Sequence, residues 1–124
     1  MYSIKLFASK TGLSAYTLRF YEKLQLLNPH RQANGHRYYT EQDLSWVNFI
    51  KRLKDTCMPL KTIQDYAALR QQGNSTLAQR LEILLSHQHM IEQQLNTLQG
   101  NLKHLNEKID IYHHNLRCYK QLSP

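Results

Sequence analysis

The sequence contains few of the residues on which disulfide-built and many catalytic proteins depend. Its 124 residues include two cysteines, three prolines, four glycines and one tryptophan. Two cysteines, Cys57 and Cys118, are too few for a disulfide scaffold. The chain has no Cys-X-X-Cys pair, no glycine-rich phosphate loop and no recognisable Ser/His/Asp arrangement. The sequence therefore predicts that the protein is not an enzyme and uses no cofactor.

Long apolar runs are also missing. Nothing approaches the roughly 20 consecutive apolar residues that span a bilayer, and the first residues lack the apolar segment and cleavage site of a signal peptide. We therefore expect a cytoplasmic protein without a membrane partner. Disorder is not expected either, because 41% of the residues are hydrophobic and eight are tyrosines, which supplies material for a core.

Acidic residues are scarce. The chain has 16 Lys and Arg against 9 Asp and Glu, a formal net charge of +7. Residues 1–72 hold 11 basic and 5 acidic side chains, whereas residues 73–124 hold 5 and 4. A positive surface attracts polyanions such as nucleic acid or an anionic membrane. The first 72 residues are therefore expected to provide the electrostatic attraction, and the rest to serve another purpose.

Two short helices are predicted at the start of the chain. We expect the first over residues 4–10, capped by Ser3, and the second up to about Leu24, capped by Ser14, with Gly12 between them. Such a pair forms a helix-turn-helix, whose second helix can enter a major groove. The residues expected to form its small core are Leu6, Leu13, Leu18 and Phe20.

A β-hairpin is predicted within residues 30–39. Asn34-Gly35 lies between two short segments, and both residues tolerate a positive φ. We interpret this hairpin as a wing, and its arginine and tyrosine side chains suit contact with phosphates. The residues that the wing carries are Arg31, His36, Arg37, Tyr38 and Tyr39.

Two further helices complete the head. Residues 40–43 (TEQD) resemble a capping box at the start of a helix ending near Thr56. Its inward side chains are expected to be Leu44, Val47, Ile50 and either Leu53 or Lys54. After Pro59, another helix is predicted over residues 60–71, with Ile63, Ala67 and Leu69 facing inward. Gly73-Asn74 ends it.

The last third of the chain has a heptad pattern. Alternate steps of four and three residues from Leu77 to Tyr119 give thirteen positions, of which twelve are apolar, where a composition of 41% hydrophobic residues gives about five by chance. This pattern predicts a coiled-coil dimerisation helix, and the simplest partner is a second copy of the chain. The seam residues are Leu77, Leu81, Leu84, Gln88, Ile91, Leu95, Leu98, Leu102, Leu105, Ile109, Tyr112 and Leu116, followed by Tyr119.

Several segments in this order resemble the MerR family of bacterial transcription regulators. They are residues 17–22 (TLRFYE), 26–29 (LLNP), 35–39 (GHRYY), 43–44 (DL), 49–50 (FI) and 58–60 (MPL). The resemblance implies a mainly α fold, with a winged helix-turn-helix head of four helices plus a short two-stranded wing, followed by a long helix that forms an antiparallel coiled coil. The expected domains are a DNA-binding domain at 1–72, a dimerisation helix at 75–120 and a C-terminal tail at 121–124.

The resemblance also implies a function. A homodimer would bind an inverted repeat in double-stranded promoter DNA and would distort the promoter, thereby acting on RNA polymerase indirectly. The recognition helix would contact DNA through Tyr16, Thr17, Arg19 and Tyr21. The wing would contribute Arg31, His36, Arg37 and Tyr38, and the following helix would contribute Lys61. Phe20 departs from the usual tyrosine and lacks its hydroxyl group.

The sequence motifs are most similar to those of the aldehyde- and thiol-stress branch of the family. Cys57 stands where the family usually has a turn glycine, and it is the candidate sensor residue, because a reactive thiol is one way to receive such a signal. The alternative is an inert thiol, and Arg52 stands where that branch often has its sensor cysteine. Because the chain ends just after the long helix, no large effector domain is expected, although a small-molecule or stress effector is compatible with the pattern. Metal binding is not expected, although His114 and Cys118 share a helix face with four-residue spacing.

An architectural nucleic-acid-binding protein without effector control would share these features. Specific enrichment of promoter repeats would distinguish the regulator from it.

Overall fold

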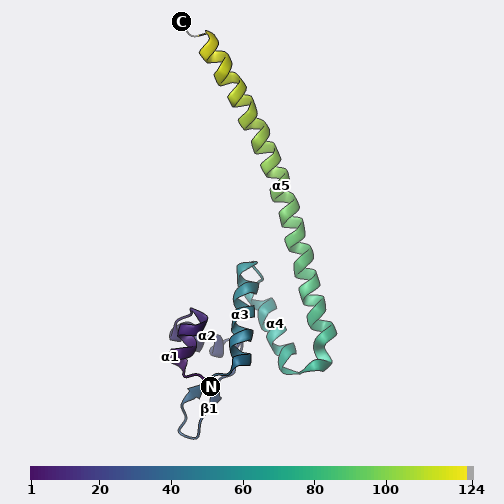
Figure 1. The fold of residues 1–124 in the computed structure, drawn as a ribbon. Coiled ribbons are helices and arrows are strands. Elements are labelled where there is room, and N and C mark those ends of the chain that lie inside the picture. The colour runs from purple at the N-terminus through teal and green to yellow at the C-terminus, as the bar shows by residue number, and fades with distance from the viewer. Residues whose placement is uncertain (123–124) are drawn as a thin grey trace. The chain divides into compact units, whose positions relative to one another are not determined.

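The computed structural model describes residues 1–122 and divides into two compact units, Met1–Leu85 and the described residues from Ser86 onward. Its elements are α1 (Ile4–Thr11), α2 (Ala15–Lys23), β1 (His30–Arg31), β2 (Arg37–Tyr38), α3 (Glu41–Asp55), α4 (Leu60–Gln71), a 3-10 turn (Asn74–Thr76) and α5 (Leu77–Leu122) (Figure 1). The predicted fold is confirmed: it is mainly helical, with a two-stranded wing and a long final helix. Of the predicted tail, 121–124, the first two residues continue α5 and the last two lie outside the described residues.

Hydroxyl side chains cap three of the helices as the sequence predicts. Ser3 accepts a hydrogen bond from the Leu6 amide at the start of α1, and Ser14 does the same for Thr17 in α2. Thr40 and Asp43 form the reciprocal capping box of α3. Each cap satisfies amides that a helix N-terminus leaves free, which fixes where the helix begins.

Two helices end in Schellman motifs closed by residues other than glycine. Gln25 follows α2 with φ 63°, and Cys57 follows α3 with φ 62°. At the end of α3 the Cys57 amide donates to the Lys54 carbonyl at 2.9 Å, and the Met58 amide donates to the Leu53 carbonyl at 3.0 Å. Both bonds satisfy terminal carbonyls. The left-handed conformation at Cys57 is one that glycine adopts most readily, which fits the turn glycine that the family resemblance implies at this position.

The wing is a short antiparallel hairpin in which His30 pairs with Tyr38 and Arg31 pairs with Arg37. Its loop is longer than the two-residue turn that Asn34-Gly35 suggests. The Gly35 amide donates to the Gln32 carbonyl, and the Gln32 amide donates to the His36 carbonyl. Of the residues in this loop, only Gly35 has a positive φ, 83°. The hairpin loop therefore contains a β-turn over residues 32–35, and this turn ends in a glycine with a left-handed φ.

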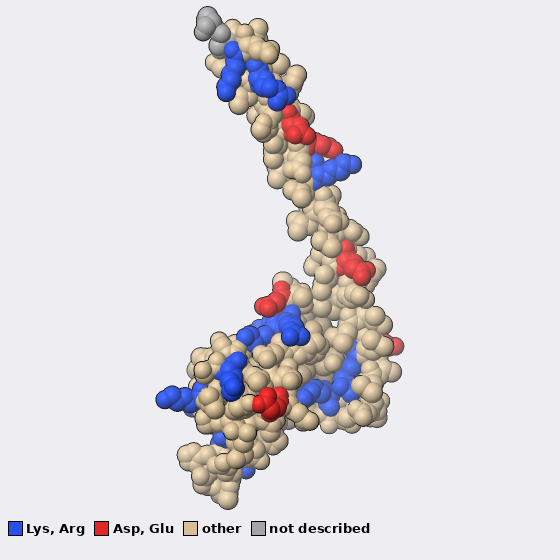
Figure 2. Space-filling model, viewed as in Figure 1, with Lys and Arg blue, Asp and Glu red and all other residues tan. Residues whose placement is uncertain are grey.

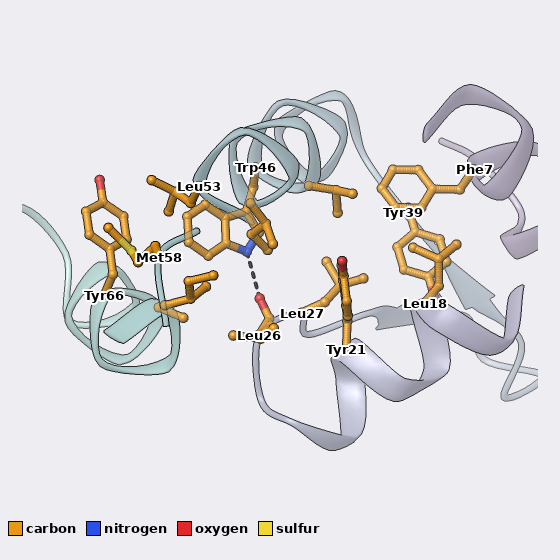
Figure 3. Close-up of a cluster of buried hydrophobic side chains, with 14 residues drawn as sticks. Phe7, Leu18, Tyr21, Leu26, Leu27, Tyr39, Trp46, Leu53, Met58 and Tyr66 are labelled. Carbon is orange, nitrogen blue, oxygen red and sulfur yellow. Dashed lines mark hydrogen bonds between the residues drawn. The ribbon is translucent and has the colours of Figure 1, made fainter. Parts of the chain in front are cut away.

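The core of the first unit forms where the helices meet behind the wing. Phe7 is fully buried and stacks on Tyr39 with ring centroids 4.3 Å apart, while the Trp46 indole donates to the Leu26 carbonyl at 2.7 Å (Figure 3). Burial raises the pKa of the Tyr39 hydroxyl, because the phenolate would lose its hydration. These contacts join α1, the strand end, α3 and the segment after α2 into one cluster.

Several inward positions differ from those predicted. Leu6 and Phe20 are each 46% exposed, and Phe7 takes the buried place in α1. In α3 the buried residue of the predicted alternatives is Leu53, while Lys54 is exposed. Tyr66 is buried in α4 beside Ile63 and Ala67, as expected for residues three and four positions apart on one helix face.

The apolar seam of α5 faces solvent in the single chain. Leu84, in the first unit, packs against the core, but most other seam positions are exposed. The exposed fractions in the second unit are 53% for Leu95, 66% for Leu98, 54% for Leu102, 57% for Leu105, 42% for Ile109, 65% for Tyr112 and 54% for Leu116. Within residues 1–122, no helix combines the length and apolarity needed to cross a membrane.

Candidate nucleic-acid interface

The outer face of α2 carries three of the predicted DNA contacts. Tyr16 is 77% exposed, and Arg19 one turn later is also exposed. Thr17 is half-buried, and its hydroxyl lies 2.9 Å from the Ser14 hydroxyl at the helix N-cap. Phe20 adds an exposed ring without a hydrogen-bonding group. This face therefore offers one cation and two aromatic rings to a ligand, without an acidic side chain among them.

An ion-pair cluster attaches the wing to this helix. Glu22, on α2, accepts a hydrogen bond from Arg37 Nε at 2.8 Å and lies 3.5 Å from Arg31 Nη2. Arg31 also donates to the Gly35 carbonyl at 3.0 Å. The carboxylate thus holds both wing arginines beside the recognition helix. This role of Glu22 is not among the predictions from the sequence, although an acidic residue in so basic a segment could have indicated an ion pair.

A hollow of about 580 Å³ opens between α2, the wing and the N-terminus. Arg19, His36, Arg37 and Tyr38 line it, together with the backbone segment 1–4. The bridge between Tyr2 and Tyr39, with amide-to-carbonyl distances of 2.7 and 2.8 Å, holds that segment against the wing. Four of the predicted contacts therefore surround one concave, basic surface. Such a surface suits a phosphate backbone, because guanidinium groups bind phosphate oxygens.

Two predicted contacts lie elsewhere. Tyr21 is only 3% exposed and belongs to the core, where Lys54 Nζ lies 3.3 Å from its hydroxyl (Figure 3). The side chain of Tyr21 therefore faces the core, because Tyr21 lies three residues after Leu18 on the buried face of α2, and its contact with DNA stays a prediction. Lys61 is exposed, pairs with Asp65 at 2.9 Å and lines a separate hollow beside Leu24 and Gln25.

Basic side chains are the more frequent charged groups on the face of the first unit drawn in Figure 2. Only a few acidic side chains interrupt them there, in line with the excess of basic residues in this part of the sequence. Such an excess raises the rate and strength of encounter with a polyanion.

The two cysteines lie apart from this surface. Cys57 is exposed at the turn between α3 and α4, with a free thiol. Cys118 lies on α5, where its Sγ is 3.6 Å from His114 Nε2. Within residues 1–122 no group of three His, Cys, Asp or Glu side chains is placed to hold a metal ion. The role of Cys57 as a sensor stays a prediction.

Comparison with known families gives two matches. The family described as "MerR HTH family regulatory protein" matches residues 2–69, and the one described as "MerR, DNA binding" matches residues 44–108. The first match covers α2, the wing and every residue that lines the hollow except Met1. The second begins within α3 and covers α4 and more than half of α5.

Individual relatives and solved structures are consistent with these family matches. The chain is 35% identical to the helix-turn-helix transcriptional regulator YyaN of Bacillus subtilis, over 91% of each chain. A crystal structure of a MerR family regulator from Listeria monocytogenes superposes with a TM-score of 0.86 at 30% identity, covering 98% of this chain and 94% of that one. HiNmlR, a MerR family regulator lacking the sensor domain and solved bound to promoter DNA, superposes with a TM-score of 0.75 at 34% identity and the same coverage.

Proposed function

Because this chain belongs to the MerR family of helix-turn-helix regulatory proteins and is a DNA-binding transcriptional regulator, we propose that it binds an inverted repeat in promoter DNA as a homodimer. The observation that carries the proposal is the basic hollow between α2 and the wing, lined by Arg19, His36, Arg37 and Tyr38. In the proposed complex α2 enters the major groove and the wing contacts the phosphate backbone. Tyr16 and Thr17 complete the contact surface of α2, and Lys61 supplies a further contact from α4.

The α5 helix supports the dimer. Its seam residues are separated by alternate steps of three and four, and the side chains from Leu95 to Leu116 are 42% to 66% exposed in the single chain. Burying them against a second copy removes a continuous apolar stripe from water. Two copies present two identical heads, which matches the two-fold symmetry of an inverted repeat.

The proposed output is a change in promoter shape. A dimer that bends or untwists promoter DNA alters how RNA polymerase engages it without touching the polymerase. We also propose that the protein works in the cytoplasm, where bacterial promoter DNA lies, and that it has no enzymatic activity of its own. The relatives are bacterial regulators of transcription, which supports both points.

We expect Arg19→Ala to weaken binding to the cognate repeat by about 1–3 kcal/mol, because the exposed guanidinium would lose its contact with a base or phosphate. The measurement is a fluorescence anisotropy titration of the full-length protein with labelled duplex at fixed salt. Arg117→Ala is the matched control, since it removes the same charge from an exposed position on α5 that is not part of the seam. Equal affinity of Arg19→Ala and Arg117→Ala would remove Arg19 from the interface.

A further inference from the structure

A further hollow lies in the first unit and shares no lining residue with the basic one. It has a volume of about 490 Å³ and is lined by α3, α4 and the start of α5. We call it the aromatic–arginine hollow and define it by Trp46, Phe49, Tyr66, Arg70 and Arg80. Its volume is within the range of about 300–1,000 Å³ that small-molecule sites occupy.

Three aromatic rings form a continuous surface in this hollow. Trp46 and Tyr66 stack with centroids 5.9 Å apart and an interplanar angle of 14° (Figure 3). Phe49 lies 5.6 Å from Tyr66 and 6.2 Å from Trp46 in tilted arrangements. Trp46 and Tyr66 are buried, whereas Phe49 is half-buried. Phe49 is therefore the ring that offers the most surface in this hollow to a planar apolar group.

Two guanidinium groups add positive charge to this aromatic surface. Arg70 Cζ lies 4.4 Å from the centre of the Trp46 ring, a cation–π contact. Arg80 is held by the turn before α5, since its Nε donates to Thr76 Oγ1 and its Nη2 donates to the Gly73 carbonyl, both at 3.1 Å. Both arginines are half-buried. Their positions are therefore fixed by contacts that leave other donors of each guanidinium available.

Neither arginine has an acidic partner. Among residues 1–122, no salt bridge involves Arg70 or Arg80, and no Asp or Glu lines the hollow. Asp43 and Arg70 both line a neighbouring hollow, but Asp43 Oδ2 accepts from the Thr40 amide at 2.9 Å and lies 3.5 Å from His30 Nε2. Two half-buried guanidinium groups without a carboxylate partner can donate charge-assisted hydrogen bonds to an anion supplied from outside.

We infer that the aromatic–arginine hollow binds a small aromatic carboxylate. The ring of the ligand packs on Phe49 and the neighbouring aromatic surface, while its carboxylate accepts hydrogen bonds from Arg70 and Arg80. The site lies in the same unit as the DNA-binding surface but shares no lining residue with it. The inference therefore stands on its own geometry and can fail while the proposed DNA binding holds.

The single tryptophan makes the test direct, because Trp46 is the only indole in the chain. Full-length protein is titrated with sodium benzoate at constant ionic strength while tryptophan emission is recorded. We expect a saturable change with a dissociation constant on the order of 1 mM, typical of so small a ligand. Benzamide has the ring without the charge, and acetate has the charge without the ring, so both should bind at least about tenfold more weakly.

Substitutions of Arg70 and Arg80 test whether benzoate binds in the aromatic–arginine hollow. Arg70→Gln and Arg80→Gln should each raise the dissociation constant for benzoate at least about tenfold, because each removes a charged donor. Arg52→Gln is the matched control, since Arg52 is exposed on α3 and does not line the hollow. Because Arg80 also holds the Gly73 turn, thermal unfolding of each variant is compared with that of the parent, and Arg70→Gln tests the site independently of that turn.

Three results would overturn the inference. The first is the absence of a saturable response to benzoate at concentrations well above the expected constant. The second is an equal response to benzoate and benzamide, which would mean that the charge is irrelevant. The third is an Arg70→Gln variant that binds benzoate as tightly as Arg52→Gln does. An anisotropy titration with promoter duplex on the same samples shows separately whether DNA binding is intact.

Discussion

Replacing Leu98 and Leu105 together by glutamate is expected to convert the protein to a monomer and to lower its affinity for inverted-repeat DNA at least about 100-fold. The two side chains are 66% and 57% exposed in the single chain and lie one heptad apart on the α5 seam. In the proposed dimer they are buried, so four carboxylates would enter an apolar interface without partners. Separate heads then lose the gain from binding two half-sites at once, which typically amounts to about 10²–10⁴ in affinity.

Sedimentation equilibrium measures the monomer fraction, and anisotropy titration measures the affinity. The control is the double variant Asn96→Glu and Thr97→Glu, which adds the same charge at exposed α5 positions that are not part of the seam. The control should remain dimeric. A Leu98→Glu and Leu105→Glu protein that stays dimeric and keeps its affinity would show that α5 does not hold the dimer together through this seam.

Phe7→Ala should lower the free energy of unfolding by about 3–5 kcal/mol. Phe7 is fully buried and stacks almost parallel to Tyr39 at 4.3 Å. Its removal leaves a cavity between α1 and the segment that connects the wing to α3. Leu6→Ala is the control, because Leu6 is 46% exposed and its truncation should cost less than about 1 kcal/mol.

Urea unfolding followed by circular dichroism, at one protomer concentration for all variants, gives both values. The sequence alone assigned Leu6 to the core, so the two variants distinguish the two assignments. A larger loss for Leu6→Ala than for Phe7→Ala would reverse the orientation of α1 derived from the structure.

The helix boundaries could be predicted because they depend on local chemistry. Ser3, Ser14 and Thr40 cap helices through hydrogen bonds to amides three residues later, so their effect can be read from neighbouring residues alone. The α5 pattern was equally clear, because a heptad repeated over many turns leaves little ambiguity in which face is apolar.

Burial within the short helices could not be predicted in the same way. An eight-residue helix such as α1 offers Leu6 and Phe7 as adjacent apolar candidates, and the choice depends on Tyr39, which is distant in sequence. Tyr21 was assigned to the DNA-facing surface by its place in a family motif. Its three-residue spacing from Leu18 indicated the buried face instead, and the structure follows that spacing.

The role of Glu22 depends on contacts between separate elements. Its carboxylate meets Arg31 and Arg37 only after the hairpin folds back beside α2. The aromatic–arginine hollow likewise combines side chains from α3, α4 and α5 that are up to 34 positions apart in the sequence, from Trp46 to Arg80. No local pattern contains this information. The excess of basic residues in the first 72 positions, in contrast, can be counted from the sequence and predicts the positive charge of the proposed interface.

The central claim is that a dimer of this chain recognises an inverted repeat in promoter DNA. The most direct measurement is selection of genomic fragments by the purified protein, followed by footprinting of those that bind. The account predicts one recurrent inverted repeat, located in a promoter and protected symmetrically on both half-sites. Recovery of fragments without a shared sequence, bound only through salt-sensitive contacts, would contradict sequence-specific recognition and would favour an architectural protein instead.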